Sequence, residues 1–241
     1  MAASAPPSVL VLLCGLPAAG KTTLARRFTA AGSSSTRRFD RISFDDLYYA
    51  SSTSKTGILP VDFDPERWKS CQKEMARRVR RCVEQQRTAA GTTDKAIAED
   101  ERQQLVLLID DNFQYRSLRK RFFQLAADLN CGFAILYVNI PAPLCRERNA
   151  ARCAQGEESA RVPDEVFQRM ASVFEPPDGR QNPWERNTHE LRPDGATNED
   201  AKVQEAMDIL INQAARELTE RRFRLEETQR KTTLQVSRER F

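Results

Sequence analysis

The sequence has one histidine, no C-x-x-C pair and no long apolar run, and each shortage excludes a class of protein. A lone His189 excludes a histidine-rich metal site and argues against a Ser-His-Asp hydrolase. Six cysteines without C-x-x-C spacing argue against a zinc ribbon. Because no stretch is long and apolar enough to span a bilayer, no membrane partner is expected.

The composition is that of a soluble protein. Of 241 residues, 40% are hydrophobic and 30% are charged, which suits one large domain or one domain with a small appendage. The net charge of +4 permits a nucleic-acid partner without requiring one, and the basic clusters at 77–81, 119–121 and 146–152 are interpreted as solvated helix faces. Cys14 and Cys131 fall in predicted strands, so we interpret them as core residues of a cytoplasmic protein.

Residues 15–22 are the most informative stretch, because they fit the phosphate-binding pattern G-x-x-x-x-G-K-[ST]. An apolar run precedes them and a helical pattern follows. Glycines let the backbone wrap around phosphate oxygens, while loop N–H groups and the helix N-terminus direct positive dipoles at them. Lys21 is predicted to reach the β- and γ-phosphates of ATP, and Thr22 to bind Mg²⁺. The predicted nucleotide-binding residues are Gly15, Leu16, Pro17, Ala18, Ala19, Gly20, Lys21, Thr22 and Thr23.

A short apolar run near the N-terminus is also typical of a secretory signal. Here no Lys or Arg precedes the run, and Pro6 and Pro7 occupy the place of the charged segment. The small residues that would form a cleavage site lie inside the phosphate loop. We therefore expect no signal peptide.

Strand-like runs alternate with helical patterns, which favours an α/β fold with a parallel sheet and crossover helices. Strands are expected near residues 8–14, 39–44, 105–109 and 132–139. Helices are expected near 20–31, 65–87, 118–129, 141–154, 163–174 and 199–230. Loops are expected at 32–35, 50–64, 88–102 and 155–162. Buried helix faces are predicted at Trp68, Cys71, Met75, Val79 and Cys82, at Leu118, Phe122, Leu125, Ala126 and Leu129, and at Met207, Leu210, Ile211, Ala214 and Leu218.

Acidic pairs follow two of the predicted strands. Asp110 and Asp111 close the clearest apolar strand, where a carboxylate can act on Mg²⁺ directly or through water. The alternative is that they cap the next helix. Asp45 and Asp46 follow the neighbouring strand, at the edge of the sheet where acceptors bind. We predict Asp45 as general base, with Asp46 second, and the alternative is an N-cap for a short turn.

Arg148 and Arg152 are four residues apart on a predicted helix, so they share a face. Two guanidinium groups at a γ-phosphate would stabilise the charge that spreads in the transition state. The polar break after them suits a lid that closes over the site. The alternative is an exposed basic face.

With these features in place, the chain resembles the family of L-seryl-tRNA(Sec) kinases over most of residues 8–191. The phosphate loop alone is not specific to that family. The segment from Asp110 to Arg119, D-D-N-F-x-Y-x-S-x-R, and the segment from Asn182 to Asn187, N-P-W-E-x-N, are much more specific. Shorter matches are Phe44-Asp45-Asp46 and the R-x-x-x-R spacing of residues 148–152.

The resemblance implies a P-loop kinase that uses ATP and Mg²⁺ to phosphorylate the serine of Ser-tRNA(Sec), giving O-phosphoseryl-tRNA(Sec) for selenocysteine synthesis. Asp45 matches the acidic residue proposed in the family as base or Mg²⁺ partner. Archaeal members carry an arginine three residues further on, where this chain has Tyr48, so no catalytic role is assigned there. The implied catalytic residues are Asp45, Lys21, Arg148 and Arg152. The implied metal residues are Thr22, Asp45, Asp110 and Asp111.

The chain departs from the family at its C-terminus, where members carry a helical domain that helps to hold the tRNA. We predict a kinase domain at 1–195 and a shorter helical extension at 196–241. Three other functions stay open: a tRNA-binding ATPase of the Elongator-associated type, a small-molecule or polynucleotide 5′-end kinase, and a nucleotide-binding remnant. No DNA partner is expected, and the sequence leaves the oligomeric state open.

Overall fold

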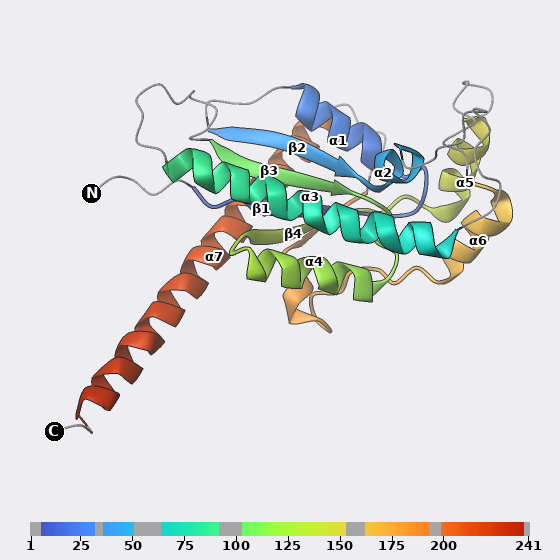
Figure 1. The fold of residues 1–241 in the computed structure, drawn as a ribbon. Helices are drawn as coiled ribbons and strands as arrows, with labels where there is room; N and C mark the ends of the chain where they lie inside the picture. Colours follow the sequence, from blue (N-terminus) through green and yellow to red (C-terminus); the bar gives the residue numbers. More distant parts are fainter. Residues whose placement is uncertain are drawn as a thin grey trace.

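Within the residues that the structure describes, five parallel strands form one sheet in the order β2-β3-β1-β4-β5, with helices on both faces (Figure 1). The computed structural model describes residues 6–31, 36–50, 64–91, 103–152, 162–192 and 199–238. The strands are β1 (Val9–Cys14), β2 (Arg37–Ser43), β3 (Gln104–Asp110), β4 (Gly132–Val138) and β5 (Thr188–Leu191). The helices are α1 (Lys21–Ala30), α2 (Phe44–Ala50), α3 (Pro65–Gly91), α4 (Arg116–Asp128), α5 (Ala142–Ala151), α6 (Asp164–Ser172), the 3₁₀ turn η3 (Pro183–Glu185) and α7 (Glu199–Arg238).

The two central strands are buried along their whole length, which explains their continuous apolar sequences. Leu10 and Leu12 of β1 face a layer that includes α3 and α4. Val9 and Val11 face the opposite layer, which α1 and α7 cover. The predicted α/β fold with a parallel sheet is therefore confirmed.

The long C-terminal helix has two different halves. The predicted apolar face from Met207 to Leu218 is buried against the sheet. Residues 223–231 are exposed, and this half projects from the body of the fold (Figure 1). The first half of α7 shares a core with β1, β3 and β4, while the division at residue 195 stays a prediction.

Three sequence expectations need correction. The strand predicted to include Phe44 ends at Ser43, because Phe44 begins α2. Residues 88–91, which were expected to begin a loop, belong to α3, because this helix continues to Gly91. The sequence reading also missed β5, which is short, partly polar and paired in parallel with β4. The expected loop at 32–35 and most of those at 50–64, 88–102 and 155–162 lie outside the described residues.

The other predicted core faces are confirmed. The residues predicted from Leu118 to Leu129 are buried, as are Cys71, Met75 and Val79 on α3, whereas Trp68 and Cys82 are partly buried. Cys14 and Cys131 are buried free thiols. Within the described residues, none of the helices combines the length and the hydropathy needed to cross a bilayer.

Candidate nucleotide and phosphoryl-transfer site

The loop between β1 and α1 has the backbone of an anion cradle. Gly15 has φ 151°, and a Cβ there would lie 2.6 Å from the Val138 carbonyl oxygen, so the loop lies tightly against the end of β4. Gly20 has φ 98° and precedes α1, whose first turn receives no side-chain cap. Ala18 also lies in the left-handed region at φ 60°. The first-turn N–H groups of α1 are thus left to bind an anion.

Lys21 is buried at the base of this loop. Its ammonium donates hydrogen bonds to the carbonyls of Gly15 (3.0 Å) and Leu16 (2.7 Å) and to Oδ1 of Asn112 (2.8 Å). Burial lowers the pKa of Lys21, and the carboxylate of Asp110 opposes that shift. Asn112 belongs to the D-D-N-F-x-Y-x-S-x-R segment, but the sequence predicted no site role for it. Its position directly after the two strand-end aspartates is the sequence feature that could have indicated a role at the site.

Asp110 is almost fully buried and forms an ion pair with Arg41, whose Nε lies 2.8 Å from Oδ2 of Asp110. The same guanidinium donates to Oδ2 of Asp46 at 2.9 Å. Arg41 therefore links the end of β3 to the first turn of α2, which also carries Asp45. No sequence motif had indicated Arg41.

Asp111 lies in a different environment from its neighbour. Its Oδ2 accepts a hydrogen bond from Nε2 of Gln72 (2.9 Å), and its Oδ1 accepts one from the backbone N–H of Asn112 (2.7 Å). Burial raises the pKa of Asp111 to about 6, although the bond from Asn112 offsets part of the rise. Asp110 is thus paired with a cation, whereas Asp111 is held by amides.

Asp45 lies on α2 at the mouth of the same crevice, where its side chain stays exposed to solvent. The surrounding protein atoms still remove part of its hydration, which raises the pKa of Asp45, and the nearby charge of Asp110 adds to that rise. Lys21 acts in the opposite direction. Tyr49, one turn further along α2, lines the crevice beside Asp45.

The structure brings most of the predicted site residues together around one small cavity of about 110 Å³. Arg152 lines it, but Arg148 does not. Both arginines line an adjoining cavity of about 450 Å³, between the phosphate loop, α5 and the start of α7. The predicted site residues around the small cavity are Pro17, Ala18, Gly20, Lys21, Thr22, Thr23, Asp45, Asp110, Asp111 and Arg152.

The donor set fits a magnesium ion that a bound nucleotide completes. Across the described ranges, no three Asp, Glu, His or Cys side chains come close enough to hold a metal by themselves. Mg²⁺ usually takes only one or two carboxylates and completes its shell with water and phosphate oxygens. Thr22, Asp110 and Asp111 supply a hydroxyl and two carboxylates around the same cavity.

The two most specific motifs also contact each other in the core, away from the crevice that Asp110 and Asp111 line. Arg119 and Glu185 are both fully buried and form an ion pair, with Nε of Arg119 2.7 Å from Oε1 of Glu185. The arginine also donates to the carbonyls of Phe113 and Glu175, each at 2.8 Å. Asn187 donates to the carbonyls of Phe133 and Leu210. The interpretation of Arg119 as part of a solvated basic face was wrong.

Comparison with known proteins identifies a family and several similar proteins. The AAA domain family matches residues 10–177. L-seryl-tRNA(Sec) kinase of Mus musculus is 29% identical over 219 residues, which cover 74% of this chain and 57% of that protein. The Homo sapiens protein of the same name is 26% identical, covering 84% of this chain and 65% of its own. The chain thus spans less than two thirds of either relative.

A solved structure supports the fold. Chaetomium thermophilum Kti12, in complex with ADP-AlF3, is similar with a TM-score of 0.58 and 17% sequence identity. The match covers 84% of this chain and 98% of the Kti12 chain. At this identity, the likeness shows a shared fold.

Proposed function

Because the chain belongs to the AAA domain family, whose match spans residues 10–177, we propose that it is an ATP-dependent phosphotransferase acting on an alcohol. One observation carries the proposal: a phosphate-binding loop, its lysine, three carboxylates and an arginine all line one crevice. The loop suits a triphosphate, and the carboxylates suit a metal and a hydroxyl proton. A cavity of this composition supports phosphoryl transfer.

The proposed transfer is a direct displacement. The acceptor hydroxyl oxygen bonds to the γ-phosphorus, the bond from that phosphorus to the β,γ-bridging oxygen breaks, and ADP leaves. Asp45 takes the hydroxyl proton, a role favoured by its raised pKa and its place at the open mouth of the crevice. Lys21 and Arg152 stabilise negative charge on the transferring group. When bound, Mg²⁺ would neutralise charge on the β- and γ-phosphates, held by Thr22, Asp110 and Asp111.

The larger cavity beside the loop suits the nucleoside part of ATP. This cavity adjoins the small cavity, because the two share four lining residues: Ala18, Gly20, Thr23 and Arg152. Leu24, Val138 and Leu191 add apolar surface for a base. In this arrangement Arg148 contacts the nucleotide from the second cavity, and Arg152 lies where the two cavities meet.

We further propose that the acceptor is the serine of Ser-tRNA(Sec). The names of the two relatives support this substrate, as do the ordered motifs that the chain shares with their family. The predicted product is O-phosphoseryl-tRNA(Sec).

The test is transfer of label from [γ-³²P]ATP to Ser-tRNA(Sec), with an ordinary Ser-tRNA in parallel. We expect labelled phosphoserine only with the first tRNA. Asp45→Asn should retain ATP binding and lose about 10²- to 10⁴-fold in kcat, because general-base help has that magnitude. Asp46→Asn is the matched control and should lose much less, since Asp46 pairs with Arg41.

Release of free phosphate that tRNA stimulates, without any label on the serine, would refute the kinase proposal and favour the ATPase alternative. Activity on a bare nucleoside or on a 5′-hydroxyl oligonucleotide would instead indicate a small-molecule or polynucleotide 5′-end kinase. Full activity of Asp45→Asn would refute the assignment of the base.

A further inference from the structure

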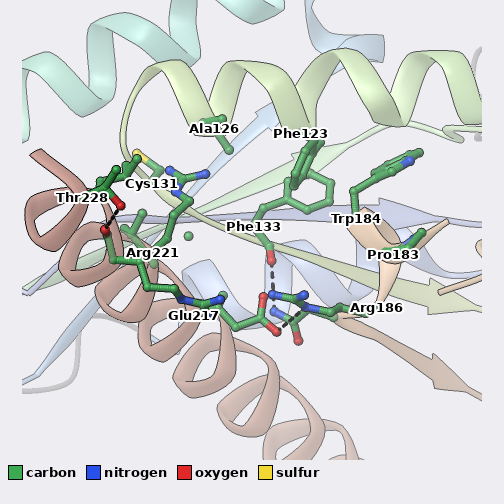
Figure 2. A pocket seen from close by; sticks show the side chains of 17 residues that line it. Phe123, Ala126, Cys131, Phe133, Pro183, Trp184, Arg186, Glu217, Arg221 and Thr228 are labelled. Carbon is green, nitrogen blue, oxygen red and sulfur yellow. Dashed lines mark hydrogen bonds and ion pairs between the residues drawn. The ribbon is translucent and has the colours of Figure 1, made fainter. Parts of the chain in front are cut away.

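A separate cavity of about 470 Å³ opens between α4, the start of β4, the residues around η3 and α7 (Figure 2). It shares no lining residue with the two cavities at the phosphate loop. Gly132, which lines it, begins β4 opposite Val9, whereas Asp110 lies at the other end of the sheet. The phosphoryl-transfer proposal gives this cavity no role.

Aromatic rings form one wall of this cavity. Phe123 packs edge-on against Phe133 at 5.4 Å and lies 5.6 Å from the ring of Trp184. The ammonium of Lys120 lies 4.9 Å from the ring centre of Phe123 and 4.8 Å from that of Trp184. The half-buried indole of Trp184 contacts Phe123 and Lys120 and also lines the cavity (Figure 2).

Small residues make the hollow beside these rings. Gly132 lies under Ala214 of α7, so closely that a Cβ on the glycine would come within 3.0 Å of the Ala214 backbone. Ala126 and Ala127 of α4 line the same space. Small residues therefore line the part of the cavity beside the aromatic wall.

Arginines surround the opening. Arg186 is paired with Glu217 at 3.0 Å, and Arg224 lies 3.5 Å from Glu220 on an exposed part of α7. Within the part of the chain that the structure describes, Arg221 forms no ion pair. With three arginines and one glutamate among its lining residues, the cavity has an excess of positive charge.

We propose that this cavity binds an unstacked nucleotide of the RNA substrate, with the base against Trp184 and the flanking phosphates at Arg221 and Arg224. Bases stack on aromatic side chains regardless of sequence, and arginine pairs with phosphate through several donors. An apolar peptide would cover the same arginines without supplying counter-charges, which is unfavourable. The inference rests on the proposed function, because it takes RNA as the substrate.

The first test measures RNA affinity by fluorescence anisotropy of labelled Ser-tRNA(Sec). The double variant Arg221→Gln/Arg224→Gln should raise Kd about tenfold and reduce the slope of log K against log salt by about 1 to 2, as expected for one or two lost phosphate contacts. Arg216→Gln is the matched control, because Arg216 is exposed on the same helix and does not line the cavity. An unchanged Kd in the double variant would overturn the proposal.

The second test detects stacking directly. The chain has two tryptophans, so Trp68→Phe leaves Trp184 as the only indole reporter. A single-stranded RNA 12-mer should quench its emission in a saturable way, with a midpoint that the arginine double variant shifts to higher concentration. Emission that stays constant while anisotropy reports bound RNA would refute stacking on Trp184.

Failure of this proposal can be distinguished from failure of the proposed function. If the wild type transfers phosphate and the arginine double variant binds RNA normally, only the cavity proposal is wrong. If the wild type transfers no phosphate and the double variant still weakens RNA binding, only the kinase proposal is wrong. A dimer that the double variant abolishes, with RNA binding unchanged, would assign the cavity to a second copy of the chain.

Discussion

Replacing Glu185 by glutamine should destabilise the fold strongly, although Glu185 lies outside the crevice. The substitution keeps the size of the side chain and removes its charge. Arg119 would then remain fully buried without a counter-ion. Its hydrogen bonds to the carbonyls of Phe113 and Glu175 would persist, but neither carbonyl neutralises a charge.

The magnitude follows from the burial of both partners. Removing one member of a buried ion pair costs about 3–5 kcal/mol, whereas an exposed pair contributes about 0–1 kcal/mol. Glu185 also accepts a hydrogen bond from the backbone N–H of Asp178 at 3.0 Å, which the amide oxygen of glutamine can retain. For a domain of this size each kcal/mol shifts the melting temperature by about 2–4 °C, so we expect a loss of about 6–20 °C.

The assay is urea and thermal unfolding of the wild type, Glu185→Gln and the control Glu74→Gln. Glu74 lies near Arg77 and Arg78 at 3.6 and 3.5 Å on the exposed side of α3, so its substitution should change stability by less than about 1 kcal/mol. Equal midpoints for Glu185→Gln and Glu74→Gln would refute the reasoning. The pair Arg119→Met/Glu185→Leu should recover part of the loss, because it removes both buried charges.

Three further predictions concern the crevice. Asn112→Ala removes a hydrogen bond to the loop lysine, so kcat/KM for ATP should fall about 10- to 100-fold in steady-state assays, as for a bond to a charged group. Arg41→Ala leaves Asp110 buried without its cation and should lower unfolding stability by about 3 kcal/mol or more, whereas Asp46→Asn should cost less than about 1, because Asp46 is exposed. The pKa of Asp111 is raised from 3.8 to about 6, so the folded state binds its proton more tightly and loses stability as pH rises from about 4 to above 6. Asp111→Asn should therefore be more stable than wild type at pH 7 by on the order of 3 kcal/mol, with the difference vanishing near pH 4 in urea titrations.

Local sequence patterns predicted the elements that are buried on both faces. The apolar runs before Gly15 and before Asp110 have no polar position, and both became fully buried central strands. The buried helix face from Met207 to Leu218 was also predicted, because its apolar residues recur at helical spacing. By contrast, β5 has four residues and pairs with β4 at the edge of the sheet, so its sequence carries little apolar signal.

Local sequence patterns also predicted part of the candidate site. Residues whose position follows from the ends of strands and from the loop pattern, such as Lys21 and Asp45, do line the crevice. The ion pairs between these residues and other parts of the chain cannot be predicted from strand ends or loop patterns. Arg41 lies inside β2, 69 residues before Asp110, and only the parallel pairing of β2 with β3 brings the two together.

The same argument explains how some residues of a family-specific motif can hold the fold without taking part in the proposed reaction. Arg119 and Glu185 are 66 residues apart, and their ion pair fixes the segment that follows Asp111 against the segment that contains η3. Through the carbonyls of Phe113 and Glu175, the arginine also holds the backbone just before α4 and the backbone just after α6. Because Asn112 lies next to Phe113 and accepts the bond from Lys21, the buried pair supports the position of the loop lysine. A change at Glu185 should therefore affect ATP binding only through this chain of contacts, and by less than the change at Asn112 itself.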